Sequence, residues 1–141
     1  MRHIESYWEQ LTLSSNELFQ NRKFKQALAG YKEALYRAEV MNDHREACLR
    51  LEIPYMQLYI ISCNNLSNTY IELGQLPEAE NLLKRVIYYL LHLSGDTDLN
   101  KDEILLELRQ ATVELVVFGK EYCDQRTQES TFELIREEII K

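Results

Sequence analysis

The chain has 141 residues, with 16 Lys and Arg against 23 Asp and Glu, so its formal net charge at pH 7 is -7. A chain of this length forms one domain with a single core, and its surplus of carboxylates would repel a phosphate backbone, which argues against a nucleic-acid partner. Because it contains four Gly and two Pro, it has little material for tight hairpins or phosphate-binding loops, and we predict an all-α fold.

The first predicted helical hairpin covers residues 4–51. Apolar residues recur at the i, i+3, i+4 spacing from Ile4 to Phe19, which predicts a helix ending near Asn21. The same spacing resumes at Phe24 after a polar break and predicts a second helix, for which we take Leu51 as the furthest end.

The second predicted hairpin covers residues 54–94. Pro54 suits the first turn of a helix, where its missing N–H costs nothing, and Gly74 is expected to end that helix in a left-handed conformation. Pro77 then opens the next helix, and Gly95 is its expected stop.

The third predicted pair covers residues 100–141. Asn100 followed by Glu103 resembles a capping box and predicts a helix start. Ser130 with Glu133 repeats the signal for a short final helix, for which Thr127 is the alternative cap. Six helices joined by short turns predict three antiparallel pairs within a single domain.

Several functional classes find no support in the sequence. No apolar run reaches the ~18 residues that a membrane span requires, and the start of the chain shows no targeting segment. Three widely spaced cysteines (Cys48, Cys63 and Cys123) without a C-x-x-C motif favour buried thiols in a reducing, cytoplasmic compartment. His44 and Cys48 share a helix face, but two ligands do not make a metal site. We expect no metal, no cofactor and no enzymatic activity, since catalytic motifs are missing.

One segment carries a family resemblance. It reads Cys63-x2-Leu66-Ser67-x2-Tyr70, then Gly74 at the turn, then Ala79-x3-Leu83, and it is similar to a tetratricopeptide repeat. The first hairpin repeats the pattern more weakly, with Ser15, Ala27 and Tyr31 in corresponding places and Arg22 at the position of the turn glycine. Ala27 and Ala79 are 52 residues apart, whereas the family period is 34, so we expect extra helical turns on each side of Pro54. The third pair resembles a capping unit or a diverged repeat.

The resemblance implies a right-handed stack of hairpins that acts as a binding scaffold. Such domains hold a peptide or helix of a partner protein in a concave groove lined by the first helix of each pair. Carried over by position, the groove residues are Thr12, Asn16, Gln20, Asn64, Asn65, Asn68, Glu72 and Arg109. Asn16 and Asn65 stand where some family members clamp a peptide backbone or a terminal carboxylate. Thr12 replaces a Lys of that clamp, and Arg109 is the one candidate base, so we do not expect recognition of an acidic C-terminal tail.

The close grouping of Asn64, Asn65 and Asn68 is unusual, because Asn is a poor helix former. These amides either bind a ligand's backbone or are simply solvated or bonded to neighbouring helices. We therefore predict a protein-interaction module, with two alternatives. One is a small acidic chaperone of secreted proteins, which the chain resembles in size, charge and repeat count. The other is a structural homo-oligomer whose groove is filled by its own terminal helix, residues 131–141.

Self-association is a further expectation. Tyr88 and Tyr89 are adjacent, so they cannot both face one core. One of them is expected to belong to an outer contact patch, and a homodimer is the commonest use of such a patch.

Overall fold

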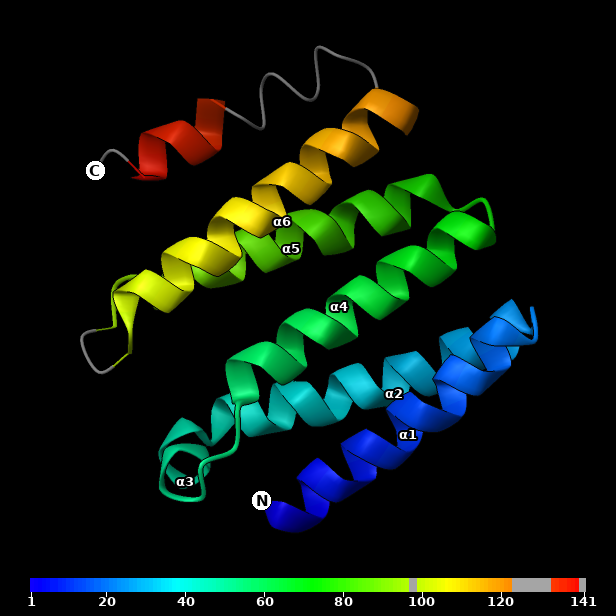
Figure 1. Ribbon diagram of the computed structural model, residues 1–141, viewed down its shortest axis with the longest axis horizontal. Coiled ribbons are helices and arrows are strands. Elements are labelled where there is room, and N and C mark those ends of the chain that lie inside the picture. The colour runs from blue at the N-terminus through cyan, green and yellow to red at the C-terminus, as the bar shows by residue number, and fades with distance from the viewer. Residues whose placement is uncertain (97–98, 123–132, 140–141) are drawn as a thin grey trace. The chain divides into compact units, whose positions relative to one another are not determined.

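The computed structural model describes residues 1–96, 99–122 and 133–139, and within them it contains helices and no strand (Figure 1), which confirms the all-α class. The helices are α1 (Arg2–Gln20), α2 (Phe24–Asp43), α3 (Arg45–Arg50), α4 (Tyr55–Glu72), α5 (Leu76–Leu93), α6 (Lys101–Tyr122) and a helical segment at 133–139. The chain divides into two units, Met1–Leu82 and Leu83–Lys141, which are described separately below.

In the first unit, α2 packs against both α1 and α4. Small residues make this possible: Ala27, Ala34 and Ala38 lie along one face of α2 and are fully buried. A buried hydrogen bond also joins the outer two helices, because Trp8 Nε1 on α1 donates to Ser62 Oγ on α4 at 2.7 Å. The three helices therefore share one core.

The turn between α1 and α2 is a Schellman motif in which Arg22 takes the left-handed position, with φ of 61°. The N–H of Arg22 donates to Phe19 O at 3.0 Å, and the N–H of Lys23 donates to Leu18 O at 2.9 Å. After α4, Gly74 has φ of 74°, and the same pair of bonds runs from the N–H of Gly74 to Ile71 O and from the N–H of Gln75 to Tyr70 O, which confirms the predicted capping role of Gly74. The first hairpin thus uses an L-residue in a conformation that suits glycine.

Arg22→Gly is expected to raise the free energy of unfolding by about 0.5–1 kcal/mol, because glycine removes the steric cost of the left-handed backbone. Urea unfolding followed by circular dichroism measures the change. The matched control is Asn21→Gly, whose φ of -83° carries no such cost, so it should bring no gain. A lower unfolding free energy for Arg22→Gly would contradict the explanation.

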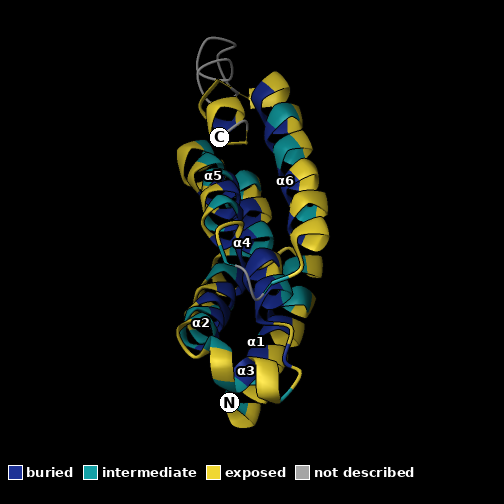
Figure 2. Cartoon of the chain, turned by 90° about the vertical axis from the view of Figure 1, so that its left-hand side faces the viewer, coloured by how far each residue is buried: buried dark blue, intermediate teal, exposed yellow. Residues whose placement is uncertain are grey.

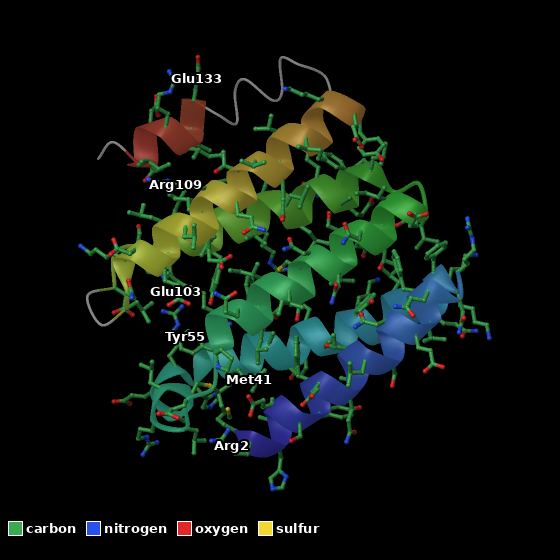
Figure 3. The ribbon with its side chains drawn as sticks, in the orientation of Figure 1. Arg2, Met41, Tyr55, Glu103, Arg109 and Glu133 are labelled. Carbon is green, nitrogen blue, oxygen red and sulfur yellow. The ribbon has the colours of Figure 1, made fainter. Side chains whose placement is uncertain are left out.

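The helix that begins at Phe24 ends well before Leu51, the furthest end that we considered for it. The helix α2 ends at Asp43, and His44 leaves helical geometry with φ of -124° and ψ of 47°. The following residues form the separate short helix α3, which buries Cys48. Two contacts join the α3 region to its neighbours. Cys48 Sγ lies 3.4 Å from Met41 O on α2, and Arg2 Nη2 on α1 donates to Leu51 O at 2.6 Å. Figure 3 shows Arg2 and Met41 at the end of the unit where α3 lies.

The expected lengthening of the helices around Pro54 accounts for only part of the 52-residue spacing: α2 has 20 residues and α4 has 18, more than two helices of a 34-residue repeat can have. Gln20 and Glu72 end α1 and α4, and Phe24 and Leu76 begin α2 and α5, so both pairs of boundaries are 52 residues apart. The 52-residue offset is longer than the 34-residue period of the family, and the additional residues include α3 and the segment that connects α3 to α4. Pro54 is the residue just before α4, not part of its first turn.

In the second unit, α6 begins as predicted at a capped start. Asn100 Oδ1 accepts hydrogen bonds from the backbone N–H of Asp102 at 3.0 Å and of Glu103 at 3.2 Å. One face of α6 is buried and another is exposed along its length (Figure 2). The buried residues are Ile104, Leu108, Ala111, Leu115, Phe118 and Gly119. Of the predicted final helix, the structure describes residues 133–139, where Ile135 is buried; Ser130 lies outside the described residues.

Candidate functional site

A pocket of about 160 Å³ lies in the first unit. Three helices line it: α1 with Asn16, Phe19 and Gln20, α2 with Tyr31, and α4 with Asn65 and Asn68. Four of the predicted groove residues, namely Asn16, Gln20, Asn65 and Asn68, are thus brought together. They come from stretches of chain almost fifty residues apart, so the shared pocket depends on the packing of the helices.

Tyr31 orients Asn16. The Tyr31 hydroxyl donates a hydrogen bond to Asn16 Oδ1. Since that oxygen is occupied, the Asn16 amide presents its NH₂ donors to the pocket or to solvent. Tyr31 is only 3% exposed, and burial raises the pKa of its phenol, so the hydroxyl remains a proton donor at neutral pH.

The other three amides of the pocket differ in exposure. Gln20 and Asn68 are exposed and Asn65 is half-buried. Within the described part of the chain no side-chain hydrogen bond is found for these three amides, and each offers both donors and an acceptor. The backbone beneath them is ordered by a bond from Thr69 Oγ1 to Asn65 O at 2.7 Å. The pocket therefore holds a set of neutral hydrogen-bonding groups carried by helices.

Phe19 and Tyr31 supply the apolar part of the pocket. The Phe19 ring packs edge to face on Phe24, with ring centroids 5.1 Å apart, and this contact spans the α1–α2 turn. The sequence pattern assigned both Phe19 and Tyr31 to helix stripes that face the core. No signal in the sequence marks them as pocket residues, because a side chain that borders a pocket has the same periodicity as one that is enclosed.

The remaining predicted groove residues lie elsewhere. Thr12 was expected on the open face of α1, but its side chain is covered, with 7% exposure, and Thr12 Oγ1 is buried without a hydrogen-bond partner among the described residues. Asn64 lies on α4, 52 residues after Thr12, and its Oδ1 is likewise buried without a hydrogen-bond partner among the described residues. Glu72 is exposed at the end of α4 and does not line the pocket. Arg109 (Figure 3) is exposed on α6, in the second unit.

The possible metal ligands are engaged with the backbone. His44 Nδ1 lies 2.9 Å from Val40 O, and Cys48 Sγ lies 3.4 Å from Met41 O. Burial also raises the pKa of the Cys48 thiol, which disfavours the thiolate that binds metals. Among the described residues, no group of three or more His, Cys, Asp or Glu side chains is placed to hold a metal ion. Cys123 lies outside them.

The residues behind the oligomer predictions lie in the second unit. Tyr88 is 47% exposed while Tyr89 is half-buried, so the two side chains differ in environment as their adjacency predicted. The proposed groove-filling segment is described only at residues 133–139, where Leu134 and Ile139 are exposed. Both the homodimer and the self-filled groove stay predictions.

Within the described ranges, none of the helices combines the length and the hydropathy needed to cross a lipid bilayer.

Comparison with known proteins places the chain in a family. A search among curated proteins and a search among solved structures found no match. A family model described as "Protein of unknown function (DUF2753)" matches residues 6–137. Because this match covers nearly the whole sequence, the chain belongs to the DUF2753 family of proteins of unknown function.

Proposed function

We propose that this chain is a non-enzymatic protein-interaction module, built of tetratricopeptide-like hairpins, that binds an extended segment of a partner protein at the pocket formed by α1, α2 and α4. The observation that carries the proposal is the convergence of four side-chain amides, from Asn16, Gln20, Asn65 and Asn68, on that pocket. We call these four residues the amide cluster.

The spacing of the amide cluster suits a peptide backbone. Asn16 and Gln20 are one helical turn apart, about 6 Å along the axis of α1. If an extended peptide lies along α1, its backbone groups on the side facing the helix repeat every two residues, about 6.8 Å. This is close to the ~6 Å that separates Asn16 from Gln20 along the axis of α1. Asn65 and Asn68 provide a second row on α4.

The absence of charge at the pocket also favours binding of a peptide backbone. None of the lining residues carries a formal charge, so burial of a peptide backbone there does not desolvate an ion. Each amide that pairs with the backbone contributes about 1 kcal/mol net. Binding at this pocket is expected to depend only weakly on salt, since screening acts on charges.

The tetratricopeptide-like part of the proposal rests on the first two hairpins. Their helix boundaries repeat at a 52-residue offset, and small residues allow close helix contact in both. In the second hairpin, Ser67 Oγ donates to Ala79 O at 3.0 Å, and both residues are buried. In the first, Gly30 lies directly against Ser15. Such close approach is what the small residues of the repeat pattern provide.

The double variant Asn65→Ala/Asn68→Ala tests the proposal. Peptides selected from a displayed library of random heptapeptides on the wild-type protein are expected to bind the double variant about 30-fold more weakly, since two hydrogen bonds of about 1 kcal/mol each are lost. Fluorescence anisotropy of the selected peptides measures the affinities. The melting temperature should stay equal or rise slightly, because Ala is the better helix former.

The matched control is Asn81→Ala, an exposed position on α5 outside the pocket, where peptide affinity should be unchanged. Failure to select any peptide on the wild-type protein over the double variant would overturn the proposed function, as would equal binding of the selected peptides to all three proteins.

A further inference from the structure

We infer that the pocket receives one uncharged side chain, between leucine and phenylalanine in size, from an internal position of the bound segment, and not the segment's C-terminal carboxylate. This inference rests on the proposed function and specifies which peptides the site selects.

The size of the pocket sets the first limit. The pocket is a depression open to solvent with a volume of about 160 Å³, similar to the ~150 Å³ of an enclosed engineered cavity that accommodates benzene. One phenyl ring or one branched aliphatic chain fills such a space. An alanine methyl leaves most of it empty and forfeits the contacts that a larger side chain would make with the walls.

The arrangement of its walls sets the second limit. The ring of Phe19, which packs on Phe24, provides most of the apolar surface, since Tyr31 beside it is only 3% exposed. The amide cluster supplies the polar part of the lining. A side chain packed on the Phe19 ring brings its own backbone N–H and C=O near the amides, so apolar contact and hydrogen bonding occur on the same residue of the ligand.

Charge sets the third limit. Neither Lys nor Arg lines the pocket, so a carboxylate placed there would lose water without gaining a cation. Tyr31 donates to Asn16 Oδ1, which leaves the NH₂ donors of Asn16 available, and a neutral backbone carbonyl satisfies such donors at lower desolvation cost. An internal residue of a peptide, which has carbonyls and no terminal charge, fits this lining.

Capped amino acids test the preference directly on the wild-type protein. The probes are N-acetyl-leucinamide, N-acetyl-phenylalaninamide, N-acetyl-alaninamide and the free acid N-acetyl-leucine. The readout is the side-chain amide signals of the amide cluster in ¹H–¹⁵N correlation spectra. We expect the Leu and Phe amides to bind with millimolar Kd, in keeping with their size, the Ala amide at least tenfold more weakly, and N-acetyl-leucine no more tightly than its amide.

A pocket-filling variant locates the binding. Asn65→Phe, checked for folding by circular dichroism, should abolish the shifts of the remaining cluster signals, whereas Asn81→Phe should leave them intact. The comparison among probes on the wild-type protein needs neither variant, so a folding defect in one of them does not affect it.

Several results would overturn the inference: equal shifts with the Ala and Leu amides, tenfold tighter binding of the free acid, or no shift with any probe. Its failure is distinguishable from failure of the proposed function. If library peptides lose affinity for Asn65→Ala/Asn68→Ala but show no fixed apolar residue, the interaction site stands and the side-chain preference is wrong.

Discussion

Trp8→Ala is expected to lower the free energy of unfolding by about 3–5 kcal/mol, the cost of removing a large buried aromatic side chain. Trp8 is 7% exposed, and its Nε1 donates to Ser62 Oγ at 2.7 Å. The substitution therefore leaves a cavity in the core and removes a link between α1 and α4. Because Trp8 is the one Trp of the chain, unfolding should be followed by far-ultraviolet circular dichroism rather than by fluorescence.

A double-mutant cycle separates the hydrogen bond from the cavity. Trp8→Phe keeps most of the ring but removes the donor, and Ser62→Ala removes the acceptor and leaves a buried N–H, at a cost of about 1–3 kcal/mol. Ser62 Oγ itself donates to Leu58 O at 2.8 Å, which keeps the hydroxyl in place for Trp8. The coupling energy should be about 1 kcal/mol; additive effects would show that the bond contributes nothing to stability.

Gly30→Leu is expected to lower the free energy of unfolding by about 3 kcal/mol, which corresponds to roughly 10 °C in melting temperature for a domain of this size. A Cβ at position 30 would lie 2.0 Å from Ser15 Oγ and 3.3 Å from Ser15 Cβ. Ser15 is 1% exposed, so either its hydroxyl rotates away or α1 and α2 move apart, and the larger leucine side chain favours the second. Gly30→Ala should cost less, because Ala gains about 1 kcal/mol of helix propensity over Gly.

Two variants test this explanation by thermal denaturation. Ser15→Ala in the Gly30→Ala background removes the closest atom and should restore part of the lost stability. Gly95→Ala is the matched control, since its Cβ would meet only His92 O, at 3.7 Å, and stability should hardly change. If Gly30→Leu melts within 2–3 °C of the wild type, a shift below 1 kcal/mol, the helices are not in close contact at this point.

The sequence predicted a helix boundary correctly where the local backbone geometry favours one residue type at that position. Gly74 adopts the left-handed conformation at the end of α4, and Asn100 caps α6 through its side chain. The break between α2 and α3 had no such signal. Neither glycine nor proline occurs there, and His44 leaves the helical region where the chain folds back and Cys48 lies against Met41 O. This contact joins residues seven positions apart, and Arg2 on α1 also donates to Leu51 O just after α3; neither contact follows from helical periodicity or from a local capping signal.

The candidate site could be predicted only in part, because it also depends on contacts between residues far apart in the sequence. The sequence identified unusual amides on α1 and α4, and helical periodicity placed Asn16 and Gln20 on one face. It could not distinguish Thr12, one turn earlier on that face, from Asn16. The difference is depth: Thr12 is covered, while Asn16 borders a pocket. This depth depends on what the neighbouring helices place over each residue, and no local pattern records it.

The sequence by itself therefore determined the all-α class, most helix boundaries and the set of amide side chains, because propensity, capping and periodicity act over a few residues. Only the tertiary structure decided that Asn16 and Gln20 meet Asn65 and Asn68 at one pocket, and that Tyr31 from a third helix orients Asn16. These contacts join residues 15 to about 50 positions apart, and they depend on close helix packing at Gly30 and on the bond between Trp8 and Ser62.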